Sequence, residues 1–88
     1  MVQANDLKAT IEAQIKGNNV MVYSKSYCPF ATQTKNLLRA KGINAKIVEL
    51  DVVANGAQIQ NTLRQMTGQG TVPNVFIKGE HIGGNSDI

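Results

Sequence analysis

Hydrophobic positions in this chain follow helical spacing in some stretches and strand spacing in others. Over residues 6–16 an apolar residue recurs at every fourth position, which predicts an amphipathic helix that ends at Gly17. Its apolar positions are Leu7, Ile11 and Ile15. A continuous apolar run over 20–23 predicts a buried strand, and a second run over 47–50 predicts another strand. The first half of the chain therefore alternates helix and strand.

Two further helices are predicted, one between these strands and one after them. The first begins at Pro29, a residue that suits a first helical position, and runs to residue 41, where Gly42 is placed to end it in a left-handed conformation. Its expected buried residues are Thr34, Leu37 and Leu38. The second is opened by Asn55 and Gln58, which resemble a capping box. Its expected buried residues are Ile59, Leu63 and Met66.

The last third of the chain predicts a β-hairpin. Two short runs, 74–77 and 81–82, flank a turn over 78–80. His81 is the only histidine, and we expect it to be a solvated strand residue without a catalytic role. The element order predicts one right-handed βαβ unit followed by an antiparallel pair on the same sheet. We therefore expect a single α/β domain over 1–88, with a four-stranded mixed sheet flanked by helices.

Cys28, the only cysteine, stands at the turn between the first strand and the second helix. A helix N-terminus favours a thiolate over a thiol, and Lys25 adds a positive charge nearby. Ligands of α/β folds gather at the carboxyl ends of the parallel strands, where this turn lies. The sequence therefore predicts a nucleophilic thiol here, the alternative being a small buried apolar residue.

Charge and composition exclude several classes of protein. The nine basic residues, with net charge +3, are spread along the chain and rarely adjoin aromatic residues, so we expect no nucleic-acid partner but a surface that attracts small anions. A lone cysteine forms no internal disulfide and suits a reducing compartment. The chain starts without a secretory pattern and has no membrane-length apolar run. We expect a soluble, cytoplasmic monomer without membrane partners.

Three segments resemble, in order and separation, the signature segments of the glutaredoxin family. They are Lys25–Phe30, Thr71–Ile77 and Gly83–Asp87. The resemblance implies a thioredoxin-like fold and a glutathione-dependent oxidoreductase that reduces protein–glutathione mixed disulfides. It further implies that Cys28 is the catalytic nucleophile, that glutathione is the co-substrate and that glutathionylated proteins are partners. No metal or organic cofactor is expected besides glutathione.

The resemblance also implies a set of glutathione-binding residues. Lys25 would stabilise the thiolate and hold the glycine carboxylate, and Phe30, where the family commonly has tyrosine, would form an aromatic wall. A cis peptide before Pro73 would let the Val72 backbone pair with glutathione like an added strand. The segment 84–87 would receive the γ-glutamyl group, unless it is only a hairpin exit and helix cap. The implied set is Lys25, Phe30, Gln60, Thr71, Val72, Pro73, Gly84, Asn85, Ser86 and Asp87.

Three departures from the family pattern limit what the resemblance implies. Ala31 stands where many members have a second cysteine, so only a monothiol route is open. Gly70 replaces a residue that is often basic, so we expect a weaker hold on a carboxylate. No C-terminal helix follows Ile88, so we expect the γ-glutamyl anchor to be less constrained, unless these 88 residues are a truncated version of a longer protein.

Two other functions stay open on the sequence. One is a dimer that bridges a [2Fe–2S] cluster with a Cys28 and a glutathione from each chain, against which the rigid Pro29 argues. The other is a module that binds glutathione without turnover.

Overall fold

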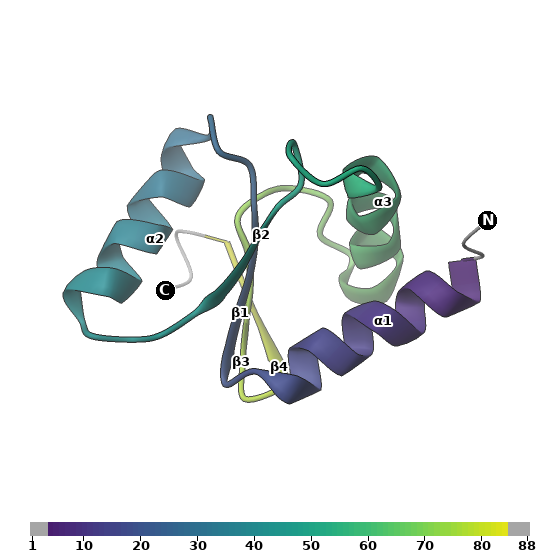
Figure 1. The fold of residues 1–88 in the computed structure, drawn as a ribbon, viewed down its shortest axis with the longest axis horizontal. Coiled ribbons are helices and arrows are strands. Elements are labelled where there is room, and N and C mark those ends of the chain that lie inside the picture. Colours follow the sequence, from purple (N-terminus) through teal and green to yellow (C-terminus); the bar gives the residue numbers. More distant parts are fainter. Residues whose placement is uncertain (1–3, 85–88) are drawn as a thin grey trace.

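A computed structural model describes residues 4–84 and contains every predicted element in the predicted order (Figure 1). The helices are α1 (Ala4–Gly17), α2 (Pro29–Ala40) and α3 (Gly56–Thr67). The strands are β1 (Val20–Ser24), β2 (Lys46–Glu49), β3 (Asn74–Ile77) and β4 (Glu80–Gly83). In the sheet, ordered β2-β1-β3-β4, β1 is parallel to β2 and antiparallel to β3, which pairs antiparallel with β4. The predicted mixed sheet and βαβ unit are confirmed.

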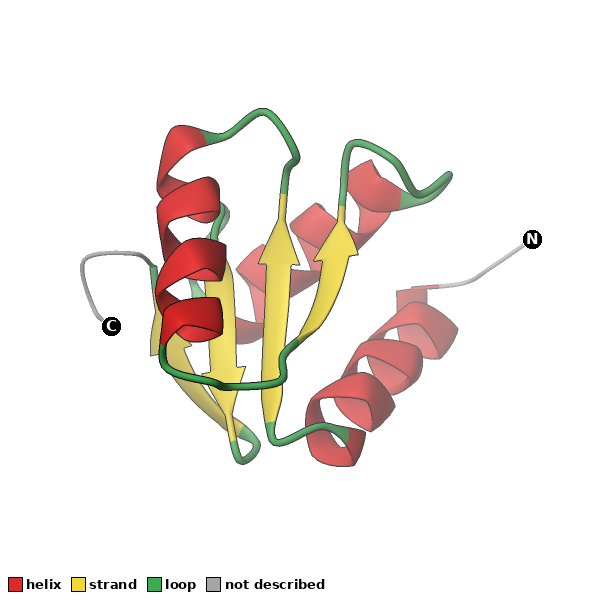
Figure 2. Cartoon of the chain, turned by 60° about the vertical axis from the view of Figure 1, so that its left-hand side comes forward, coloured by secondary structure: helices red, strands yellow, loops and turns green. Residues whose placement is uncertain are grey.

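Helices cover both faces of the sheet, α2 on one side and α1 with α3 on the other (Figures 1 and 2). Successive side chains of a strand point to opposite faces. In β1, Met21 and Tyr23 therefore join the core under α1 and α3, while Val20 and Val22 join the core under α2. Burial on both faces explains why this strand is a continuous apolar run.

The helix ends agree with the sequence at their glycines. Gly42, just after α2, and Gly68, at the end of α3, adopt left-handed φ angles of 72° and 79°. At the start of α3 the prediction was wrong, because Asn55 is the N-cap residue but its side chain makes no capping hydrogen bond.

Two further expectations need correction. Leu37 is 36% exposed, because Thr34 and Leu38 share the face of α2 that meets the sheet and Leu37 lies off that face. The hairpin turn contains two residues rather than three. Lys78 and Gly79 take positive φ angles of 51° and 82°, as two-residue hairpin turns require, so Glu80 already belongs to β4 and pairs with Ile77.

Candidate active site

Cys28 is the N-cap residue of α2, with Pro29 directly after it in the first turn. Its carbonyl accepts hydrogen bonds from the backbone N–H (2.9 Å) and the hydroxyl (3.0 Å) of Thr32. Its own N–H donates to the carbonyl of Lys25 at 3.1 Å, which closes the turn between β1 and α2. The thiol is free and partly exposed, so the alternative of a fully buried structural cysteine is wrong.

The thiol faces a loop that is 44 residues away in sequence. Its Sγ lies 3.8 Å from the carbonyl oxygen of Val72, as a weak S–H donor. The peptide bond between Val72 and Pro73 is cis, as predicted. Pro73 is buried, Val72 is partly buried against the core and Thr71 is exposed. The fold thus brings together the first two sequence motifs.

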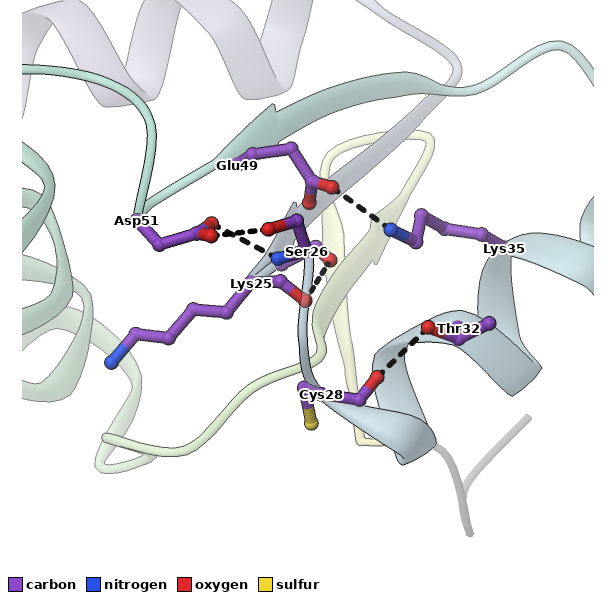
Figure 3. Close-up of polar contacts among 8 residues, drawn as sticks. Lys25, Ser26, Cys28, Thr32, Lys35, Glu49 and Asp51 are labelled. Atoms are coloured by element: carbon purple, nitrogen blue, oxygen red, sulfur yellow. Dashed lines mark hydrogen bonds and ion pairs between the residues drawn. The ribbon is translucent and has the colours of Figure 1, made fainter.

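Lys25 and Phe30 flank the thiol on the same turn but do not enclose it. The Lys25 side chain extends away from the sulfur (Figure 3), so its role at the thiolate stays a prediction. Phe30 lies in the first turn of α2 and is 61% exposed. Tyr27, which the sequence reasoning did not single out, is 70% exposed, so an exposed aromatic residue stands on either side of Cys28 in the sequence.

Asp51 anchors the turn that carries the thiol. Its carboxylate accepts hydrogen bonds from the backbone N–H of Ser26, at 2.9 Å, and from the Ser26 hydroxyl (Figure 3). The Ser26 hydroxyl, the Ser26 N–H and, to a smaller extent, the charge of Lys25 lower the pKa of Asp51. The loops after the parallel strands β1 and β2 are thereby tied together. The sequence reasoning missed this residue, which only the pairing of β1 with β2 could have indicated.

An ion pair ties α2 to the edge strand beside it. The Lys35 ammonium lies 2.9 Å from one carboxylate oxygen of Glu49, and both side chains are mostly buried (Figure 3). The second oxygen of Glu49 is buried without a hydrogen-bond partner among the described residues. The pair holds α2, whose N-cap residue is Cys28, against β2.

Polar side chains hold the loop opposite the thiol from both ends. The Gln60 amide, on α3, donates to the carbonyl of Gly70 at 2.7 Å. The Gln69 amide donates to the carbonyls of Pro73 (3.0 Å) and Thr71 (3.4 Å), on either side of Val72. Gln60 therefore supports the loop before Val72, and its role towards glutathione stays a prediction. The sequence analysis missed the part played by Gln69.

His81 is less isolated than the sequence suggested. It is exposed, as expected, but its Nε2 lies 2.9 Å from the Oδ1 of buried Asn74, and its ring packs against Phe76 at 5.1 Å between centroids. The Asn74 amide in turn donates to the carbonyl of Gln69 at 3.4 Å. The hairpin is thus connected to the loop beside Pro73.

Gly84, in the third sequence motif, lies next to the loop that faces Cys28. A Cβ atom built on Gly84 would stand 3.6 Å from the Pro73 carbonyl oxygen and 3.8 Å from the Gln69 amide nitrogen. The end of β4 therefore reaches the loop that faces Cys28. The predicted residues Asn85, Ser86 and Asp87 lie outside the described residues.

Between residues 4 and 84, histidine, cysteine, aspartate and glutamate side chains form no group of three or more that could hold a metal ion. None of the described helices is long and apolar enough to cross a membrane.

Comparisons with known proteins match this chain to one protein family. Residues 20–82 match the family model described as Glutaredoxin. A glutaredoxin of Vernicia fordii is 50% identical over 78 residues, a match that covers 86% of this chain and 75% of the relative. A chloroplastic monothiol glutaredoxin of Arabidopsis thaliana is 46% identical over 82 residues, covering 92% of this chain and 46% of the relative.

The fold agrees with solved structures as well. A crystal structure of a buckwheat glutaredoxin–glutathione complex superposes with a TM-score of 0.93 at 38% identity, covering 97% of this chain and 77% of that one. The thioredoxin-like fold predicted from the sequence is therefore confirmed.

Proposed function

This chain belongs to the glutaredoxin family of glutathione-dependent thiol–disulfide oxidoreductases, and we propose that it reduces mixed disulfides between glutathione and protein or small-molecule thiols by a monothiol mechanism. One observation carries the proposal. The only thiol of the chain stands, partly exposed, at the N-terminus of α2 and faces the backbone of Val72. The nucleophile therefore lies beside the backbone that we propose pairs with glutathione.

The proposed reaction has two steps. The Cys28 thiolate attacks the glutathione sulfur of the mixed disulfide, the old S–S bond breaks, and the substrate thiolate leaves and takes up a proton. A second glutathione, as thiolate, then attacks the glutathione sulfur held on Cys28, which releases glutathione disulfide and restores the Cys28 thiolate. In sum, the substrate sulfur is reduced to a thiol, and one free glutathione is oxidised as it joins the glutathionyl group of the mixed disulfide in glutathione disulfide.

The surroundings of Cys28 support each step. The helix N-terminus carries unpaired N–H groups and a partial positive charge, which favour a thiolate both as nucleophile and as leaving group. The backbone N–H and C=O of Val72 would pair with glutathione as one more strand, between Thr71 and Pro73. Gln60 and Lys25 would lie towards the glycine end, and Gly84 with the residues after it towards the γ-glutamyl end. Because position 31 is alanine, no second thiol competes for the adduct.

Cys28→Ser tests the proposal, because a serine hydroxyl is far too weakly acidic to replace a thiolate at neutral pH. We expect release of glutathione from a glutathionylated peptide, followed by a coupled assay, to fall at least about 100-fold. Circular dichroism of the variant should match the parent. Activity of the serine variant within a few-fold of the parent would overturn the mechanism.

Anaerobic reconstitution with iron, sulfide and glutathione separates this enzyme from a cluster carrier. A carrier would give a coloured dimer that collapses when glutathione is removed, since half of its thiolate ligands would be external. We expect a colourless monomer, because Pro29 restrains the turn that bridging would have to move. A stable, visibly absorbing dimer would favour the carrier.

A further inference from the structure

Gln69 holds the backbone on both sides of Val72 with a single side-chain amide. Its Nε2 donates to the carbonyl oxygen of Pro73 at 3.0 Å and to that of Thr71 at 3.4 Å. An amide nitrogen carries two hydrogens, one for each carbonyl. The carbonyl between them, that of Val72, lies instead 3.8 Å from the Sγ of Cys28. Gln69 therefore binds the two carbonyl groups that flank Val72, while the Val72 carbonyl faces the thiol.

Gln69 is itself held through its own backbone. Its N–H donates to the Thr67 hydroxyl oxygen at 3.1 Å, and that hydroxyl donates to the carbonyl of Leu63, in α3, at 2.8 Å. Its carbonyl accepts a hydrogen bond from the Asn74 amide at 3.4 Å, and Asn74 is buried at the start of β3. Residue 69 is thus fixed to the end of α3 on one side and to the sheet on the other.

Recognition of a peptide at Val72 depends on how the backbone of this loop is aimed. A peptide that adds to an exposed backbone edge gains affinity from main-chain hydrogen bonds, which weaken steeply when donor and acceptor are misaligned. A loop that has to be ordered when its ligand binds loses affinity to that ordering, and a loop that is already held does not. The hydrogen bonds from Gln69 to Thr71 and Pro73 supply this order in the free protein.

We propose that Gln69 is a positioning residue, which presents the Val72 backbone to the glutathione part of a mixed disulfide. The inference rests on the proposed function, because it requires glutathione to pair with Val72, but it does not depend on the direction in which the tripeptide lies. Gln69 acts on recognition of the substrate and leaves the reactivity of the Cys28 thiol unchanged. The chain should therefore owe to Gln69 its preference for disulfides that carry a peptide backbone beside the sulfur.

The test compares Gln69→Met, which keeps the length of the side chain and removes both donors, with Gln65→Met. Gln65 is an exposed residue of α3 whose side chain makes no hydrogen bond within residues 4–84. Each protein is mixed with a glutathionylated peptide, or with the same peptide in a disulfide with 2-mercaptoethanol, which is uncharged and has no peptide backbone. Loss of the Cys28 thiol is followed in a single turnover.

We expect Gln69→Met to slow the reaction with the glutathionylated peptide about 5- to 20-fold, the size expected for two lost hydrogen bonds to a partly buried loop. The reaction with the 2-mercaptoethanol disulfide should stay at the parent rate, and Gln65→Met should match the parent with both disulfides. Alkylation of Cys28 by iodoacetamide should have the same rate and the same pH profile in all three proteins. An equal loss with both disulfides, or slower alkylation, would mean general damage to the site and would overturn the inference.

Thr67→Val provides a second variant, because it leaves the Gln69 side chain in place and removes the hydroxyl that holds the Gln69 backbone. We expect the same selective loss, smaller in size. Circular dichroism shows whether each variant is folded, and an unchanged preference for the glutathionylated peptide in either folded variant would overturn the inference.

The parent separates this inference from the proposed reaction. If the parent prefers the glutathionylated peptide in a single turnover and Gln69→Met loses that preference, the inference stands even where free glutathione fails to complete the cycle. If the parent reacts equally with both disulfides, pairing of glutathione with Val72 fails and the inference fails with it.

Discussion

At the scale of single residues, Gly56 is a position where the surrounding backbone leaves no room for a side chain. A Cβ atom on Gly56, the first residue of α3, would stand 1.7 Å from the carbonyl oxygen of Leu50 and 2.6 Å from its carbonyl carbon. Both atoms are backbone, so no side-chain rotation relieves the overlap. We expect Gly56→Ala to lower the free energy of unfolding by about 3 kcal/mol or more.

Urea unfolding followed by circular dichroism measures this loss, with Gly17→Ala as the control. Gly17 ends α1 and has open space where a Cβ would stand. Alanine there should be neutral or stabilise the protein by up to about 1 kcal/mol. If Gly56→Ala and Gly17→Ala change the free energy of unfolding equally, the backbone near Leu50 shifts at little energetic cost, which would contradict this expectation.

Asp51 makes stability depend on pH in the acid range. The Ser26 hydroxyl and N–H lower its pKa in the folded chain below the ordinary value of 3.8. Stabilisation of this kind is complete above the unfolded pKa and is lost as pH falls through the lower folded pKa. We expect Asp51→Asn to destabilise the protein at pH 7 and to differ less from the parent in buffers well below pH 3.8.

Urea midpoints of the parent and Asp51→Asn, measured at several pH values, test this expectation. Glu80→Gln is the control, because Glu80 is exposed and its side chain makes no hydrogen bond within residues 4–84. A difference between Asp51→Asn and the parent that does not change with pH would contradict the role of the carboxylate charge.

Single residues also show where prediction from the sequence succeeds. Cys28 and Pro73 belong to local motifs, and each motif contains the residue type that its position requires. Asp51 and Gln69 act through contacts that only the assembled sheet creates, since Asp51 reaches Ser26 across 25 residues and Gln69 bridges the backbone on either side of Val72. Their neighbours in sequence carry no sign of this role, so the sequence could not predict it.

At the scale of elements, periodicity predicted every helix and strand, but not the contacts at their ends. β1 was evident because burial on both faces requires a continuous apolar run. The start of α3 was predicted from a capping pattern, yet the structure forms it without a side-chain cap. The close approach of Gly56 to Leu50, the residue directly after β2, depends on the path of the loop between β2 and α3, which hydrophobic periodicity does not describe.

The first turn of α2 allows a direct test of the monothiol route. Ala31 lies three residues after Cys28 in this turn and is fully buried. In the parent, glutathione disulfide should leave one glutathione on Cys28, and the adduct should persist until free glutathione is added. In Ala31→Cys the new thiol lies within the same turn at high effective concentration, so the adduct should give way to an internal disulfide.

Intact-protein mass spectrometry distinguishes the two outcomes, and Ala31→Ser is the control that adds a side chain of similar size without a thiol. The serine variant should keep its adduct as the parent does. An Ala31→Cys adduct as long-lived as that of the parent would mean that position 31 is out of reach of Cys28, and would contradict the geometry of this turn.

At the scale of the whole molecule, the two faces of the sheet are covered unequally. α1 and α3 together close the larger core, which includes Ile11, Leu63 and Phe76, whereas α2 alone covers the smaller one, formed by Val20, Val22, Leu38 and Val75 (Figure 2). Hydrophobic stabilisation grows with the apolar area removed from water. The helix that carries the nucleophile is therefore held by the smaller core and by the pair of Lys35 with Glu49.

Native-state hydrogen exchange should reveal this asymmetry. Elements with few buried apolar contacts open locally at a lower free energy than the global unfolding of the domain. We expect the amide protons of α2 to exchange through openings about 1–3 kcal/mol less costly than those of β1 and α3, with a weaker dependence on denaturant. Equal opening free energies in α2, β1 and α3 would mean that the helices on both faces of the sheet unfold as one unit. That result would contradict a weaker hold on α2 by its smaller core. A lower value confined to α2 would mean that Cys28 stands on the part of the domain that opens most readily, while the loop of Val72, which rests on the larger core, stays in place.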